Sequence, residues 1–178
     1  VGRFVRPAHF PGFLDEQRAS LDLSRWKLAF CGAEPIDPRS LDDFATAFAG
    51  AGFRQSTFYP CYGLAEGTLM VSGKVPGTPT VHLDVSAAAL REGYILPPRA
   101  ADSDRLRFVS TGPAVHGGRV RIVDPVSLEE CRPERIGEIF GRPVVHGRAQ
   151  EMIARADAVT VACRNIAGLA HLVGERRE

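Results

Sequence analysis

Near the start of the chain, the pattern of apolar and polar residues predicts a strand, a helix and a second strand. A short apolar run over residues 26–31 is typical of a strand, and a second candidate strand covers residues 53–59 and stops at Pro60. Asp37 and Pro38 between them suit the cap and first turn of a helix that Gly50 and Gly52 end. The apolar residues that share one face of this helix are Leu41, Phe44, Ala45 and Phe48.

These three elements occupy about 35 residues, the length of a parallel βαβ unit. In such a unit the loops that follow the two strands leave the sheet at the same edge. Those loops are residues 32–35 and 60–66. Because open α/β sheets bind ligands at the carboxyl ends of their strands, the two loops are expected to share one pocket.

After Gly73 the pattern changes. Residues 73–104 are rich in Pro, Gly, Ala and Asp, with one weakly helical stretch at Val85–Glu92. Three short strands are then predicted, which indicates an antiparallel meander. They cover Arg105–Ser110, Arg119–Val123 and Gly137–Phe140. Beyond Gly147 the apolar spacing predicts a helical tail, with a face formed by Val159, Ala162, Cys163, Ile166, Leu169 and Val173.

The composition is that of an ordinary globular domain. Of 178 residues, 44% are hydrophobic and 24% are charged, and the net charge of +1 argues against a nucleic-acid binder. No apolar run is long enough to form a transmembrane segment, and four scattered cysteines indicate neither a disulfide framework nor a zinc site. These features favour a cytoplasmic protein. Since the chain begins at Val1 rather than Met, it is expected to be a fragment of something longer.

Several common catalytic motifs do not fit. Residues 67–74 look like a phosphate-binding loop, but the spacing is one residue too long and Val75 replaces the Ser or Thr that holds magnesium. Residues 110–113 lack a following lysine, and the chain has no G-x-S-x-G sequence. The five histidines have no metal-ligand spacing.

The stretch from Phe58 to Gly73 carries the richest candidate chemistry. Tyr62 can stack on a base, and Gly63 lets the backbone approach a ligand. Glu66 offers a hard oxygen ligand to magnesium, and Thr68 can donate to a phosphate oxygen. The alternative is a turn with Tyr62 in the core and Glu66 in solvent, which the residue types alone favour.

Three blocks of the chain resemble the fatty acyl-AMP ligases, a branch of the adenylate-forming superfamily. The stretch from Phe58 to Gly73 is similar to their block Y-P-C-Y-G-L-A-E-x-T-L-x-V-S-G. Residues 21–36 resemble the block L-D-L-S-x-W…G-A-E-P-I, and residues 118–139 resemble V-R-I-V-D-P…C-x-P…V-G-E-I. The blocks stand in the family's order and spacing over about residues 15–140.

The resemblance implies an α/β fold: the parallel-sheet portion of an adenylate-forming large domain, running into antiparallel barrel-like strands and a helical C-terminal tail. Residues 1–140 would be a partial AMP-binding domain, and residues 141–178 would be a divergent helical tail. One origin for this tail is a remnant of the family's hinge and C-terminal domain. Within the first part, residues 73–104 resemble the insertion that biases these ligases toward a carrier protein instead of free coenzyme A.

The resemblance also assigns site residues, with ATP or AMP and Mg²⁺ as cofactors. The residues that would contact the nucleotide are Gly32, Ala33, Glu34, Tyr62, Gly63 and Thr68. The first three and Tyr62 border the adenine in the family pattern, and Thr68 lies next to the phosphates. Glu66 occupies the position of the family's magnesium-binding acid. No residue matches the family's catalytic lysine, its Ser/Thr/Gly-rich phosphate loop or its ribose-binding aspartate.

The implied reaction joins a fatty acid to ATP, giving acyl-adenylate and pyrophosphate, and then transfers the acyl group to an acyl carrier protein or a polyketide synthase carrier domain. Because the charged groups named above have no counterpart, the chain alone is expected to be inactive. One alternative is a non-catalytic remnant that at most binds nucleotide or a protein partner. Another is an acyl-CoA ligase fragment, which residues 73–104 argue against.

Overall fold

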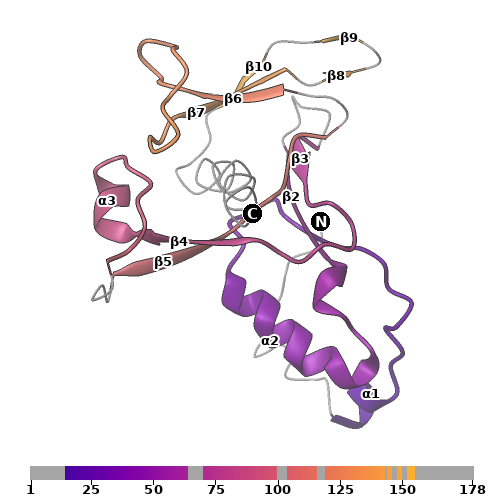
Figure 1. Ribbon diagram of the computed structural model, residues 1–178. Helices are drawn as coiled ribbons and strands as arrows, with labels where there is room; N and C mark the ends of the chain where they lie inside the picture. The colour runs from indigo at the N-terminus through magenta and orange to yellow at the C-terminus, as the bar shows by residue number, and fades with distance from the viewer. Residues whose placement is uncertain are drawn as a thin grey trace, which may run out of the picture.

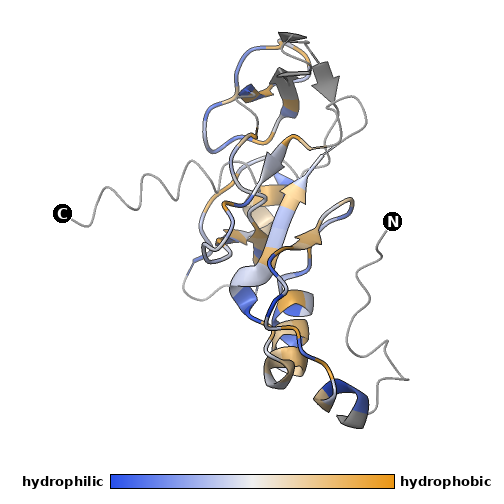
Figure 2. Cartoon of the chain, turned by 90° about the vertical axis from the view of Figure 1, so that its right-hand side faces the viewer, coloured by the Kyte–Doolittle hydropathy of each residue, from blue (hydrophilic) through white to orange (hydrophobic). Residues whose placement is uncertain are grey.

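In a computed structural model of the chain, the described part is elongated, with the first helices of the chain at one end and an antiparallel sheet at the other (Figures 1 and 2). The described residues are 15–63, 70–99, 104–115, 119–142, 144–145, 148–149 and 152–154. A short helix, α1 (Asp15–Ala19), precedes a three-stranded sheet in the order β1-β2-β3. Among the described residues, no helix has the length and apolar character needed to span a membrane.

The predicted βαβ unit is confirmed. Strand β1 (Ala29–Cys31) pairs in parallel with β2 (Phe58–Tyr62), with helix α2 (Pro38–Phe48) between them in sequence. Asp37 caps α2 and Pro38 is its first residue, as predicted. After a 3₁₀ turn over Ala49–Ala51, Gly52 reverses the chain in the left-handed conformation, with φ of +82°. Strand β3 (Ser72–Gly73) is antiparallel to β2.

The boundaries of both parallel strands differ from the prediction. Residues 26–28 precede β1: the Trp26 backbone N–H closes a turn by donating to the Leu23 carbonyl, and its indole N–H donates to the Leu28 carbonyl. Residues 53–57 are not part of β2, since a 3₁₀ turn over Gln55–Thr57 interrupts the extended backbone. Strand β2 also continues through Pro60, whose carbonyl accepts from the backbone N–H of Lys74 and which has no N–H of its own to satisfy.

Aromatic rings fill the space between α2 and the parallel strands. Phe44, Phe53 and Phe58 contact one another, with ring centroids 5.0 Å apart for Phe44–Phe53 and for Phe53–Phe58. The apolar face of α2 is the predicted one: Leu41 and Phe48 are buried, and Phe44 and Ala45 pack against the same cluster. Apolar and polar segments alternate along the helix in Figure 2, as expected for a helix covered on one side.

Antiparallel strands form the rest of the described chain. The hairpin of β4 (His82–Ser86) and β5 (Arg105–Val109) is followed by a sheet in the order β10-β7-β6, formed by β6 (Arg119–Val123), β7 (Glu138–Arg142) and β10 (Met152–Ala154). The predicted strands over 105–110, 119–123 and 137–140 are therefore confirmed. Helix α3 (Ala87–Arg91) is shorter than the predicted helical stretch, because Val85 and Ser86 pair with β5 and the Ser86 side chain caps the helix.

Two expectations for the antiparallel region are corrected. The strands do not close into a barrel in the described part of the chain, where the sheets remain separate. Strands also follow where a helical tail was expected to begin: β8 (Val144–Val145) pairs with β9 (Arg148–Ala149), and β10 pairs with β7. Antiparallel pairing, of β10 with β7 and of β8 with β9, satisfies the backbone polar groups there. The predicted helical face over 159–173 lies outside the described residues.

Candidate functional site

The two loops predicted to share a pocket begin side by side at one edge of the parallel sheet. Gly32 follows β1 directly and meets the backbone of Cys61 in β2. A Cβ atom at position 32 would lie 2.5 Å from the Cys61 carbonyl oxygen and 3.2 Å from its Sγ. Because real side chains do not reach such distances, only glycine allows the two strand ends to lie this close.

A cleft of about 270 Å³ lies beside this edge, between the loop after β1 and the first turn of α2. Gly32 and Glu34 line it, together with Asp37 and Ser40 from the start of the helix. Ala33, between the first two, has a left-handed backbone with φ of +69°, which is uncommon for a residue other than glycine. The cleft therefore offers backbone polar groups and carboxylate oxygens at the carboxyl end of β1.

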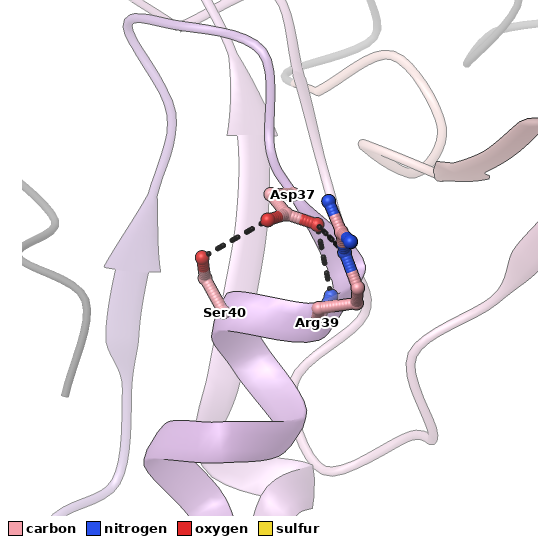
Figure 3. Close-up of polar contacts among 3 residues, drawn as sticks. All are labelled: Asp37, Arg39 and Ser40. Atoms are coloured by element: carbon pink, nitrogen blue, oxygen red, sulfur yellow. Dashed lines mark hydrogen bonds and ion pairs between the residues drawn. The ribbon is translucent and has the colours of Figure 1, made fainter. Parts of the chain in front are cut away.

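The Asp37 carboxylate is already engaged by its own helix (Figure 3). Its Oδ1 accepts from the backbone N–H of Arg39 at 3.0 Å and lies 3.5 Å from the Arg39 Nε. Its Oδ2 accepts from the Ser40 hydroxyl at 3.3 Å. These contacts fix the cleft wall at the start of α2, and they leave Glu34, which is exposed, as the freer acid of the loop.

The thiols at this edge are poor nucleophiles. Burial raises the pKa of Cys31 to about 12, and burial also raises the pKa of Cys61. Since the thiolate is the reactive form, both side chains stay protonated and inert at neutral pH. Their polar contacts are to backbone: Cys31 donates to the Ala29 carbonyl and Cys61 to the Cys31 carbonyl. Neither thiol is therefore a candidate nucleophile.

The second loop is described only at its start. Tyr62 is the last residue of β2, and its half-buried ring packs against the cluster of Val71, Val120, Ile122 and Ile139. Gly63 follows it. Glu66 and Thr68 fall within residues 64–69, outside the described residues. Among the residues that are described, no group of three or more His, Cys, Asp or Glu is placed to hold a metal ion.

No motif in the sequence indicates two sets of contacts near this edge, those of Ser72 and those of Lys74. The Ser72 hydroxyl donates to the Thr111 hydroxyl at 2.9 Å, which joins β3, beside Tyr62, to the loop after β5. The sequence around Thr111 has only the pattern of an incomplete phosphate loop, and no spacing rule links it to Ser72. Lys74, the lysine of the loop-like stretch 67–74, is buried and donates to the backbone carbonyls of Ser56 and Thr78, which agrees with the rejection of that stretch as a phosphate loop.

Comparison with known proteins agrees with this geometry. The profile of the AMP-binding enzyme family matches residues 4–146. The chain is 43% identical over 127 residues to the medium-chain-fatty-acid–[acyl-carrier-protein] ligase JamA of Moorena producens, a match that covers 70% of this chain and 22% of the relative. It is 36% identical to the long-chain-fatty-acid–AMP ligase FadD23 of Mycobacterium tuberculosis over 75% of this chain and 22% of that protein.

Solved structures give the same result. The crystal structure of the fatty acid AMP ligase from Legionella pneumophila superimposes with a TM-score of 0.69 at 34% identity, over 78% of this chain and 24% of that one. A fatty acyl-adenylate ligase from the same organism, in complex with acyl adenylate and pyrophosphate, gives 0.69 at 32% identity over 85% and 26%. The chain spans about a fifth of the length of the curated relatives it matches. With four-fifths of its length matched by the family profile, the chain belongs to the AMP-binding enzyme family.

Proposed function

We propose that this chain is part of a fatty acyl-AMP ligase, which activates a fatty acid with ATP and passes the acyl group to an acyl carrier protein or a polyketide synthase carrier domain. The observation that carries the proposal is the contact of Gly32 with Cys61, which brings the two family-like loops to one sheet edge. The relatives named as fatty-acid ligases, and the related structure that holds an acyl adenylate, support the substrate class.

In this proposal the edge holds the adenine. The loop after β1 supplies the backbone groups of Gly32 and Ala33 and the carboxylate of Glu34 beside the cleft. The left-handed conformation of Ala33 turns the loop at this point. Tyr62 and Gly63 form the other border, where the ring is held by the apolar cluster behind it. A ring already fixed by packing loses little conformational entropy when a base stacks on it.

The phosphate and metal roles fall to the loop that follows. Glu66 presents a carboxylate, the ligand type that Mg²⁺ prefers, and the Thr68 hydroxyl donates to a phosphate oxygen. Magnesium, when bound, would neutralise charge on the phosphates during attack by the fatty-acid carboxylate. Residues 1–140 are the partial AMP-binding domain, residues 73–104 its carrier-directed insertion, and residues 141–178 a divergent tail. We propose a cytoplasmic location, where ATP for this reaction is available.

A segment exchange tests the proposal. Residues 15–140 would replace the matching segment of the Moorena relative, and pyrophosphate release would be measured with Mg²⁺, ATP and a series of fatty acids. We expect the exchanged enzyme to be active and Glu66→Gln to reduce its rate at least about a hundredfold, the scale for losing one preorganised group. Glu129→Gln, which removes an exposed acid from a distant turn, is the matched control and should change the rate less than about twofold.

Two outcomes count against the proposal. An inactive exchange that folds like the parent would mean that this segment does not supply the adenine side of the site. Near-normal turnover of Glu66→Gln would favour the alternative in which Glu66 is a solvent-exposed turn residue and not a magnesium ligand. We also expect the 178-residue chain alone to release no pyrophosphate above background. Saturable ATP binding by it, with no turnover even in the exchanged enzyme, would favour the alternative of a nucleotide-binding remnant.

A further inference from the structure

The opposite edge of the parallel sheet carries a second, open hollow, of about 510 Å³. Three separate segments line it: the residues that lead into β1, the residues that lead into β2, and the turn after β3. Lys27 comes from the first segment, Arg54 and Ser56 from the second, and Gly77 from the third. At about 3.3 Å per residue, this edge is roughly 16 Å from Gly32, so the hollow is separate from the adenine cleft.

A buried lysine holds the walls of this hollow together. Lys74 is only 5% exposed, and its ammonium donates to the Ser56 carbonyl at 2.9 Å and to the Thr78 carbonyl. It therefore ties the segment before β2 to the turn after β3. The Thr57 hydroxyl donates to the Trp26 carbonyl at 3.4 Å, which ties the segments before β1 and β2 to each other. The hollow is formed by fixed segments and not by a loose loop.

The charge of the hollow is positive. Lys27 and Arg54 line it, the Lys74 ammonium lies behind Ser56, and the lining includes no carboxylate. Within the described part of the chain, neither Lys27 nor Arg54 has an ion-pair partner. Burial lowers the pKa of Lys74, and an anion in the hollow would oppose that shift by stabilising the ammonium. Two cations that line one open space with no acid among them, with a third cation buried behind it, are an electrostatic match for an anion.

We propose that this hollow is a binding site for a phosphate-bearing anion, held by Arg54 and Lys27 with the Ser56 hydroxyl as a further donor. The planar guanidinium of Arg54 matches two phosphate oxygens at once, and the Lys27 ammonium acts as a compact point charge. The hollow is larger than one inorganic ion requires, so a phosphate monoester on a small organic group also fits. The site does not depend on the proposed ligase activity, since it uses neither of the loops at the adenine edge.

Phosphate binding to the full chain tests this site. Inorganic phosphate would be titrated into the protein by isothermal calorimetry at low ionic strength, with Lys27→Gln, Arg54→Gln and the double variant. We expect each single variant to weaken binding about threefold to tenfold, and the double variant to weaken it more than about tenfold. Arg132→Gln is the matched control, because it removes the same charge from an exposed turn elsewhere, and it should leave the affinity within about twofold.

Amide NMR gives a readout that needs no variant: phosphate should shift the signals of Ser56 and Gly77, and equimolar acetate should shift them less. Glucose 6-phosphate distinguishes the source of the phosphate, since tighter binding than inorganic phosphate supports an organic monoester and equal binding supports the free ion. The proposal is overturned if phosphate does not saturate in the millimolar range, if Arg132→Gln weakens binding as much as Arg54→Gln, or if the shifts of Ser56 and Gly77 are absent.

Discussion

The β1–α2–β2 unit and the β4–β5 hairpin are neighbours that are held in different ways. In the unit, α2 covers one face of the parallel strands, and the contacts between them are buried aromatic rings. In the hairpin, the exposed Arg107 guanidinium forms a two-point ion pair with Asp84, at 2.7 and 3.0 Å, and Arg105 adds a third contact at 3.6 Å. One buried residue of the hairpin, Val109, joins the core of the unit.

Because of this difference, the two regions accept different amounts of sequence change. Close-packed interiors transmit small volume changes, so a site on the edge of the unit is placed within narrow limits. Exposed ion pairs contribute little stability and weaken with salt, so the charged positions of the hairpin can vary without disturbing that edge, whereas its buried residues Val85 and Val109 are packed in the core. The hairpin lies largely in the segment that we propose to be the ligase insertion, whereas the loops that we propose to hold the adenine follow the rigid strands.

The largest expected effect is at the centre of the packed unit. Phe58 is 1% exposed, and its ring lies 5.0 Å from that of Phe53. Phe58→Ala removes those contacts and leaves a cavity, so we expect a loss of about 3–5 kcal/mol in the free energy of unfolding, measured with denaturant. Phe30→Ala is the control: Phe30 stands on the other face of the same sheet, is 58% exposed, and should cost less than about 1 kcal/mol. Equal losses would mean that α2 does not provide the main core.

The unit was also the most predictable part of the fold. Its helix has two independent signals, the Asp37–Pro38 start and the spacing of Leu41 and Phe48, and both are local in sequence. The strand boundaries were harder to predict, because the end of β2 at Tyr62 depends on pairing with Ser72 of β3, which lies outside the local apolar pattern. Strand β4 was missed for the same reason: Val85 and Ser86 have a helical pattern that pairing with β5 overrides.

The candidate site also has contacts that the sequence predicted and contacts that it did not. The meeting of Gly32 with the β2 edge follows from parallel topology and was predictable. The bond between Ser72 and Thr111 and the hollow around Arg54 each join segments whose contact no local pattern encodes. Motifs in the sequence indicate candidate chemistry, whereas contacts created by tertiary packing become visible only in the fold.

The second largest effect is expected at the sheet edge itself. Gly32→Ala places a methyl group 2.5 Å from the Cys61 carbonyl oxygen, which the backbone can relieve only by separating the strand ends. We expect a loss of about 1–3 kcal/mol in unfolding free energy, the usual range for overpacking. Gly50→Ala is the matched control, because a Cβ there meets no atom within 4 Å, and it should be neutral or slightly stabilising. If both variants unfold alike, the two strand ends are not in contact.

A smaller effect is expected where the hairpin faces α2. Burial lowers the pKa of His82, and the charges around it are Asp42 on α2 with Asp84 and Arg107 on the hairpin. The unfolded chain therefore takes up a proton near pH 6.5 that the folded chain takes up only at lower pH, so stability falls as the pH drops through about 6.5 toward the lowered pKa. His82→Gln removes this dependence, and the denaturant midpoints of the two proteins at about pH 7.5 and about pH 5 measure it. Parallel pH dependence in both proteins would assign the effect to other groups.

The smallest expected effect is in the exposed ion pairs of the hairpin. The hydrogen bond between Arg107 and Asp84 lowers the pKa of Asp84 and raises that of Arg107, and water reaches both side chains, which are 27% exposed at Asp84 and 51% exposed at Arg107. Asp84→Asn should therefore lower the denaturant midpoint only slightly at low salt, and the loss should disappear near 1 M salt, where charges are screened within about 3 Å. Asp43→Asn, which removes an exposed acid from α2, controls for the change in net charge. A loss that persists at high salt and exceeds that of Gly32→Ala would reverse the comparison, because it would make the hairpin, and not the packed unit, the part that limits the stability of the fold.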